Sequence, residues 1–213
     1  SRICPDEIRC VGTSALGTDC LPVDRECNPL RPAILYGIDS RAEEEIKWLT
    51  QYYGDDVKKM FGHPICTGDT ATKILWIKHH EPEIYEKTYK FLTGSSYLTA
   101  KLTGRYVIDQ FLAKGSFRPL YNRDGTINKE NCGLYCRPDQ IAECAYSFEI
   151  AGTVTEDAAK ESGLKAGTPV IVGTGDSTAE AISAGLVESG TVFFQYGSSM
   201  FYYCLLYTSP SPR

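Results

Sequence analysis

A carboxylate stands between a predicted buried strand and a predicted helix toward the C-terminal end of this 213-residue chain. The strand is predicted by the apolar, β-branched run Gly167–Gly173, and a helix of small residues is predicted over Ala179–Leu186. Asp176 lies between them, and Ser177 or Thr178 is the expected N-cap of the helix. Because strands that run directly into helices build α/β folds, this segment predicts an α/β domain.

The rest of the chain alternates helix and strand signals in the same way. A short strand is predicted over Ala33–Tyr36, and apolar residues at helical spacing predict a surface helix over Arg41–Tyr53. Helical periodicity returns over Thr72–Leu92, which Pro82 is expected to divide into two helices. Later signals predict a helical turn closed by Gly104, a helix ending at Gly163 and a strand over Thr191–Tyr196. This alternation favours an α/β architecture over a helical bundle or a β-sandwich.

Composition excludes several classes of partner. Hydrophobic residues make up 42% of the chain, which is enough for a packed core. The net charge is -5 and the cations are dispersed, so no basic stripe is available for a nucleic-acid backbone. No apolar run approaches the roughly 18 residues of a membrane helix, and the first residues, SRICPDEIRC, lack the pattern of a signal peptide. We expect a cytoplasmic protein without nucleic-acid or membrane partners.

Nine cysteines are many for such a protein, so a disulfide or metal framework has to be considered. The closest group, Cys132, Cys136 and Cys144, contains no CxxC pair, and the three histidines lie far from it in sequence. We therefore expect reduced structural thiols and no metal-ligating residues.

Asp176 is the first candidate for chemistry. In open α/β sheets, ligands bind beyond the carboxyl ends of the strands, where this carboxylate is predicted to lie. Gly173 and Gly175 would let a substrate approach the backbone closely. A dinucleotide fingerprint is a poor match, because no glycine follows at the required spacing. The residues alone leave open whether Asp176 faces a ligand or only caps the next helix.

Two other polar tips follow predicted strands. Gly197, Ser198 and Ser199 form a turn whose amides and hydroxyls could hold a phosphate, although such turns are also common without a ligand. Asp39 and Arg41 could hydrogen-bond the hydroxyls of a sugar, or Asp39 could cap the helix that begins near Arg41.

Several long motifs, in a consistent order from about Ile8 to Tyr203, resemble the FGGY carbohydrate kinase family. The run PLRPAILYGIDSRA is similar to the family segment whose Asp-x-Arg tip lines the sugar pocket. KILWIKHHEPEIYEK and YLTAKLTGRYVID resemble two further family segments. AGTVTEDAAKESGLKAGTPVIVGTGD resembles the run into the catalytic Gly-x-Gly-Asp, and GSS stands where the family usually has Gly-Thr-Ser.

The resemblance implies the two-domain actin-like ATPase fold, which is ribonuclease H-like, with this chain covering mostly the first domain. It implies ATP and Mg²⁺ as cofactors and a small-molecule sugar as substrate, and it leaves a homodimer open. By the matching motifs, Asp176 is the catalytic base, and Asp39 and Arg41 bind the sugar. The cofactor-binding residues it implies are Gly175, Gly197, Ser198 and Ser199.

The same resemblance divides the chain into three parts. Residues 1–187 are expected to form the N-terminal domain without its first phosphate-binding hairpin, and residues 188–203 to begin the ATP-binding domain. Residues 204–213 read as the translation of a transposase-type sequencing adapter, so we expect an artefact there and a fragment that is inactive alone.

The identity of the sugar is less constrained. Ser14–Asp19 stands where xylulokinases usually carry a Met-His or Gln-x-Gly pattern. D-Xylulose is therefore only the first expectation. Ribulose, fuculose or glycerol kinases and a non-catalytic sugar-binding relative are the alternatives.

Overall fold

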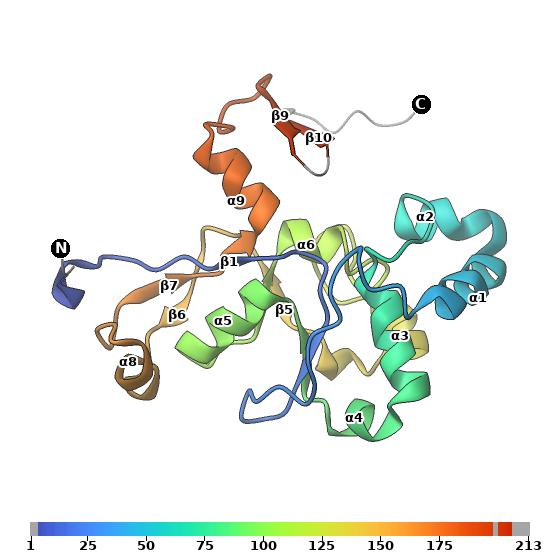
Figure 1. Ribbon diagram of the computed structural model, residues 1–213, viewed down its shortest axis with the longest axis horizontal. Helices are drawn as coiled ribbons and strands as arrows, with labels where there is room; N and C mark the ends of the chain where they lie inside the picture. Colours follow the sequence, from blue (N-terminus) through green and yellow to red (C-terminus); the bar gives the residue numbers. More distant parts are fainter. Residues whose placement is uncertain (1–3, 198–199, 206–213) are drawn as a thin grey trace. The chain divides into compact units, whose positions relative to one another are not determined.

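The computed structural model describes residues 4–197 and 200–205 (Figure 1). The chain divides into two compact units, Ser1–Gly175 and Asp176–Arg213. The first unit mixes helices with short strands, and the second contains α9 (Asp176–Ser183), β9 (Val192–Tyr196) and β10 (Met200–Cys204). Within the described part of the chain, no helix has both the length and the apolar character needed to cross a membrane.

Two helices of the first unit, α5 and α8, begin and end at residues that carry local signals. Thr93 caps α5 by accepting a hydrogen bond from the Ser96 amide, and the left-handed Gly104 ends that helix. Thr155 and Gly163 do the same for α8. The α-helices are α1 (Glu43–Tyr53), α2 (Val57–Phe61), α3 (Thr70–His80), α4 (Pro82–Lys87), α5 (Gly94–Thr103), α6 (Gln110–Lys114), α7 (Lys129–Tyr135) and α8 (Glu156–Ser162). Short 3-10 helices cover Pro5–Glu7, Gly54–Asp56 and Pro138–Gln140.

The strands of the first unit form short two-stranded ladders. β1 (Ser14–Ala15) pairs in parallel with β8 (Thr174–Gly175), and β4 (Val107–Asp109) pairs in parallel with β5 (Glu143–Ala145). β2 (Leu21–Val23) is antiparallel to β3 (Lys90–Leu92), and β6 (Ile150–Thr153) is antiparallel to β7 (Pro169–Ile171). Single bridges from Val11 to Val170 and from Phe91 to Ile141 extend these ladders.

The main core lies around α3, which packs against α1, α4 and α7 (Figure 1). Ile74, Leu75 and Ile77 of α3 are almost completely buried and belong to one apolar cluster with Leu49 of α1 and Phe91 of β3. Burying a side chain of this size contributes about 1.5–3 kcal/mol. The cluster therefore stabilises the packing of α3 against its neighbouring helices.

The expected break at Pro82 is confirmed, because α3 ends at His80 and α4 starts at Pro82. The expected continuation of the second helix to Leu92 is wrong, since α4 ends at Lys87 and Lys90–Leu92 forms β3. The expected strand over Ala33–Tyr36 is wrong, since Ile34 makes only an isolated bridge to Cys20. Pro32 has no amide hydrogen to donate, and Gly37 turns the chain at a φ of 64°. The ladder therefore stops after one residue pair.

Two expected helix starts are also wrong. α9 begins at Asp176, so Ser177 and Thr178 lie in its first turn and do not precede it. α1 begins at Glu43 with Ala42 in the N-cap position, so Asp39 is not its cap.

Candidate functional site

The parallel pair of β1 and β8 brings two distant segments to one edge of the first unit. Ser14 lies opposite Thr174, and Ala15 lies opposite Gly175. Both strands are parallel, so their carboxyl ends emerge on the same side. One leads into Gly17, whose Cα is 3.7 Å from a Cβ added at Gly175, and the other leads into Asp176.

Gly173 makes this close approach feasible. Its φ is 76°, in the left-handed region, and an added Cβ would lie 2.2 Å from the Thr13 carbonyl oxygen. Thr13 is itself held in place, because its Oγ1 lies 2.7 Å from Thr99 Oγ1, and Thr99 Oγ1 donates to the Val172 carbonyl oxygen at 3.2 Å. A side chain at Gly173 would therefore push β8 away from the segment that contains β1.

Asp176 is the first residue of α9 in the second unit. Its Oδ1 accepts a hydrogen bond from the Ser177 amide at 2.7 Å. A carboxylate is favoured at this end of a helix by the helix dipole. Ser177 Oγ lies 2.9 Å from the hydroxyl of Tyr203 on β10, which ties α9 to the hairpin of its own unit.

Gly197 follows β9 directly in a bend, and Tyr196 pairs with Met200 across the antiparallel hairpin. Residues 197–199 therefore connect the two strands in sequence. Ser198 and Ser199, the other two residues expected to hold phosphate, lie outside the described residues.

Asp39 and Arg41 are brought together as a bidentate pair. Arg41 Nε donates to Asp39 Oδ1 at 2.8 Å, and Arg41 Nη2 lies 2.8 Å from Asp39 Oδ2. The hydrogen bonds from Arg41 hold the pKa of Asp39 below its ordinary value, so this carboxylate stays ionised. Both residues line a cavity of 470 Å³ together with Leu35, Ile38 and Ser40.

Trp76 organises the charged groups beside that pair. The Arg41 guanidinium lies 4.9 Å from the centre of the Trp76 ring, and the Arg31 guanidinium lies 5.7 Å from it. His80 stacks on the same ring at 5.0 Å, and Arg31 forms an ion pair of 2.8 Å with Glu81. Sequence reasoning placed Trp76 in a motif without giving it a role. Trp76 and His80 are four residues apart on a predicted helix, and this spacing could have indicated that their side chains are in contact.

Thr18 was also missed as a potential site residue. Its φ is 64°, an uncommon conformation for a residue with a side chain. Lys73 Nζ and Thr70 Oγ1 both donate to its carbonyl oxygen. Lys73 is buried, and burial lowers the pKa of its ammonium. Backbone strain of this kind is most common at ligand sites, but the sequence carries no pattern that reveals it.

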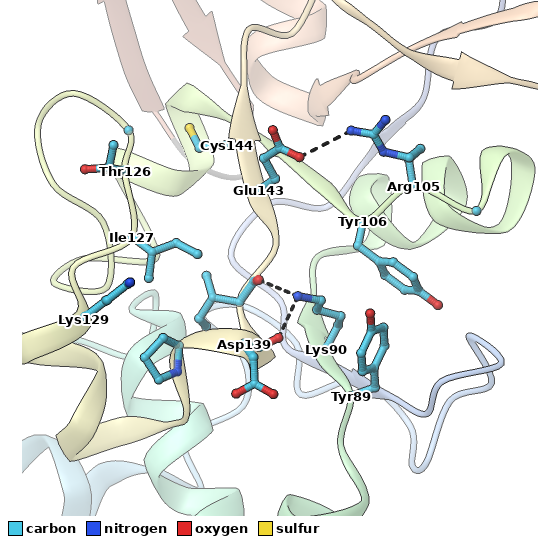
Figure 2. Close-up of a pocket in the computed structure, with 14 residues that line it drawn as sticks. Tyr89, Lys90, Arg105, Tyr106, Thr126, Ile127, Lys129, Asp139, Glu143 and Cys144 are labelled. Carbon is cyan, nitrogen blue, oxygen red and sulfur yellow. Dashed lines mark hydrogen bonds and ion pairs between the residues drawn. The ribbon is translucent and has the colours of Figure 1, made fainter.

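A separate cavity of 700 Å³ lies between β3, β5 and the 3-10 helix that follows α7 (Figure 2). Two of its cations, Lys90 and Arg105, have partners within the cavity. Lys90 Nζ donates to the carbonyl oxygens of Asp139 and Ile141 at 2.6 and 2.9 Å, and Arg105 pairs with Glu143 at 3.3 Å (Figure 2). Among the described residues, none of the site residues expected from sequence lines this cavity.

Comparisons with known proteins place the chain in a family. The model for the FGGY family of carbohydrate kinases, N-terminal domain, matches residues 1–183. Xylulose kinase of Escherichia coli is 31% identical over 185 residues, which cover 86% of this chain and 37% of that enzyme. Autoinducer-2 kinase of Klebsiella pneumoniae is 31% identical over 159 residues, which cover 72% of this chain and 29% of that protein. The chain thus spans about a third of the length of these curated relatives.

Comparison with solved structures leads to the same family. The xylulose kinase of Rhodospirillum rubrum superimposes with a TM-score of 0.80 at 26% identity, over 89% of this chain and 39% of that enzyme. The glycerol kinase of Plasmodium falciparum, solved with ADP, has a TM-score of 0.80 at 22% identity, over 91% of this chain and 39% of the other. These matches confirm the expected α/β, actin-like ATPase fold. Over the greater part of its length, the chain belongs to the FGGY family of carbohydrate kinases.

Proposed function

We propose that the protein to which this chain belongs transfers a phosphoryl group from ATP to a hydroxyl of a sugar, with a ketose such as D-xylulose as substrate. The observation that carries this proposal is the placement of Asp176 directly after β8, the strand that Gly173 and Gly175 hold close to the segment containing β1. Relatives named xylulose kinase support the choice of sugar. A kinase that uses ATP fits the cytoplasm, where ATP is made.

Asp176 is proposed as the general base. A sugar hydroxyl is a poor nucleophile at neutral pH, so a carboxylate that takes its proton during attack lowers the barrier. ATP with Mg²⁺ would supply the phosphoryl group and neutralise its charge, which is the larger share of the work in this class of reaction. The hydrogen bond from the Ser177 amide to Oδ1 would fix the orientation of the carboxylate and leave Oδ2 for the hydroxyl.

Asp39 and Arg41 are proposed to bind the sugar. The ionised Asp39 can accept hydrogen bonds from two hydroxyls, and the guanidinium of Arg41 donates in a fixed plane. The Trp76 ring packs against one face of the Arg41 guanidinium. A polar pair fixed in this way discriminates between sugars that differ in the position of a hydroxyl.

Gly175, Gly197, Ser198 and Ser199 are proposed to bind the phosphates of ATP. Gly175 lies on the strand edge beside Gly17, where a side chain would already contact Leu112 at 3.4 Å. Residues 188–203 are proposed to begin the ATP-binding domain, and residues 1–187 to belong to the domain that binds the sugar.

A second function is a sugar-binding relative that does not catalyse transfer. Asp176 argues against this alternative. Ser14–Asp19, which contains β1 and departs from the xylulokinase pattern, bears on the identity of the sugar and keeps kinases for ribulose, fuculose or glycerol as further candidates.

The experiment uses the full-length gene from the same source. Release of ADP is measured against a panel of ketoses and polyols for the wild type, Asp176→Asn and the control Asp157→Asn, which changes an exposed aspartate on α8. We expect sugar-dependent turnover that falls by about 10²–10⁴-fold in Asp176→Asn alone. Sugar binding, followed by thermal shift, should persist in that variant. Equal turnover of Asp176→Asn and wild type would overturn the assignment of the base, and sugar binding without any ADP release in the wild type would favour the non-catalytic alternative.

A further inference from the structure

The segment between α2 and α3 gathers three different metal-binding side chains. His63, Cys66 and Asp69 follow one another at intervals of three residues, and Asp69 is the residue before α3. One ligand atom from each, a ring nitrogen, the Sγ and a carboxylate oxygen, lies within 4.8 Å of the other two. Cys66 lies only three residues from His63 in sequence, whereas Cys132, Cys136 and Cys144 lie far from the histidines.

The tautomer of His63 is set by its neighbour. Its Nδ1 lies 2.8 Å from the Pro64 carbonyl oxygen, which can only accept, so Nδ1 carries the hydrogen and donates it. The other ring nitrogen, Nε2, lies 3.4 Å from Asp69 Oδ1. A proton on Nε2 or a metal cation bound to both atoms would satisfy this contact. A ring that donates its other N–H to a backbone carbonyl is also the usual arrangement of a metal-bound histidine.

Asp69 is held in a matching orientation. Its side chain is only 1% exposed, and its Oδ2 accepts the Cys66 amide at 2.8 Å. The Asp69 amide donates to the Cys66 carbonyl oxygen at 3.0 Å, which closes the turn. A carboxylate buried to this degree is stabilised by hydrogen-bond donors and by a cation beside it. Lys73, which is also buried, donates to the Thr18 carbonyl oxygen.

Cys66 completes the set from the solvent side. The residue is exposed, and the side chain of His63 is 46% exposed, so an ion could enter and both ligands could rotate. The thiolate is the form of cysteine that binds a metal, and a bound metal stabilises that form.

We propose that His63, Cys66 and Asp69 form a binding site for a borderline-soft divalent cation, with Zn²⁺ as the preferred ion. One nitrogen, one sulfur and one oxygen ligand suit Zn²⁺ better than the oxygen-seeking Mg²⁺ or Ca²⁺. Zinc bonds are about 2.0–2.3 Å long, so the widest ligand pair must close by about 1 Å. Rotation of the exposed His63 and Cys66 side chains provides this movement, and a water molecule would fill the fourth position. The site joins the α2–α3 connection to the start of α3.

The test is metal titration of the reduced, metal-free chain with Co²⁺ alone and Zn²⁺ alone. We expect one equivalent of Co²⁺ to give the visible bands of tetrahedral cobalt with a thiolate-to-cobalt charge-transfer band, and Zn²⁺ to abolish both. Cys66→Ser should remove the charge-transfer band, and His63→Gln and Cys66→Ser should each weaken Zn²⁺ binding at least about tenfold. Both side chains are exposed, so the fold should survive, which far-ultraviolet circular dichroism checks. Cys10→Ser, at another exposed cysteine, is the control and should bind normally.

Three results would overturn the proposal. An unchanged charge-transfer band in Cys66→Ser would assign the metal to other thiols. Unchanged Zn²⁺ affinity in His63→Gln would remove the histidine from the site. A change in stability in Asp69→Asn and His63→Gln without any effect of added metal would reduce the group to a protonated His63 paired with Asp69.

Discussion

Thr174 Oγ1 donates a hydrogen bond to Asp109 Oδ1 at 3.2 Å and so joins β8 to the end of β4. The same oxygen of Asp109 accepts the amides of Phe111 and Leu112 at 2.9 and 3.2 Å and thereby caps α6. One buried carboxylate therefore ties together β4, α6 and the strand that leads directly into Asp176.

A double-mutant cycle measures this link. Asp109→Ala should lower the free energy of unfolding by about 2 kcal/mol, because it removes a helix cap and the bond from Thr174. Thr174→Val should cost about 1 kcal/mol. The double variant should lose about 0.5–1.5 kcal/mol less than the sum, measured by urea unfolding. Thr153→Val, at an exposed position on β6, is the control. Strict additivity of the two changes would contradict the link.

Asp109 should also make stability depend on pH. Burial raises the pKa of Asp109 in the folded chain above its ordinary value of 3.8. The folded state then holds a proton that the unfolded state has already released, so this group destabilises the fold as pH rises through that window. In Asp109→Asn the side chain no longer titrates, but its amide oxygen can still accept the hydrogen bonds that cap α6.

The stability of Asp109→Asn relative to the wild type should therefore increase from acid to neutral pH. Unfolding by urea at a series of pH values measures this difference. A flat difference across the series would show that Asp109 has the same pKa in both states.

Alanine substitutions at Gly173 and Gly167 separate two costs. One is the strain of a left-handed backbone, and the other is the steric clash between a side chain at Gly173 and the Thr13 carbonyl oxygen. Both glycines have positive φ values, 76° and 84°, but nothing lies within 4 Å of a Cβ added at Gly167. Gly167→Ala should cost about 1–2 kcal/mol from the left-handed conformation alone. Gly173→Ala should cost at least about 2 kcal/mol more, because its Cβ would meet the Thr13 carbonyl oxygen at 2.2 Å. Equal thermal shifts for the two variants would rule out this steric explanation.

Arg41→Lys tests the proposed sugar pair in the full-length protein. A lysine keeps the charge but loses the planar, bidentate geometry toward Asp39 and the stacking over Trp76. The KM for the sugar should rise on the order of tenfold, with a smaller change in kcat, in steady-state assays. Arg105→Lys, in an exposed pair with Glu143, should leave both constants unchanged. A fall in kcat with constant KM would instead move Arg41 from sugar binding to the reaction step.

Local signals predicted the helices well where a cap or a proline marks the end. Pro82 separates α3 from α4, and Gly104 and Gly163 end α5 and α8 in the left-handed conformation. These features act within a few residues and can be read directly from the sequence. The strand expected at Ala33–Tyr36 failed because a strand also needs a partner that continues, and the partner bridge at Cys20 covers only one residue.

In the candidate site, too, some features could be predicted from the sequence and others could not. Membership of the family, which the family match confirms over residues 1–183, was readable from sequence. The roles of Asp39, Arg41, Gly175, Asp176 and Gly197 remain predictions. Thr18 could not be found in advance, since its left-handed backbone is held by Lys73 and Thr70 from a helix far along the chain.

By itself, the sequence determined the break at Pro82, the glycine ends of α5 and α8, the α/β class and the position of Asp176 after a strand. Only the tertiary structure decided that β8 runs beside β1, that Gly173 must lack a side chain and that Trp76 lies under Arg41 and Arg31. It also decided that His63, Cys66 and Asp69 converge on one point. The physical reason is that caps and turns depend on neighbouring residues, whereas pairing, close approach and convergence depend on which distant surfaces the buried core brings into contact.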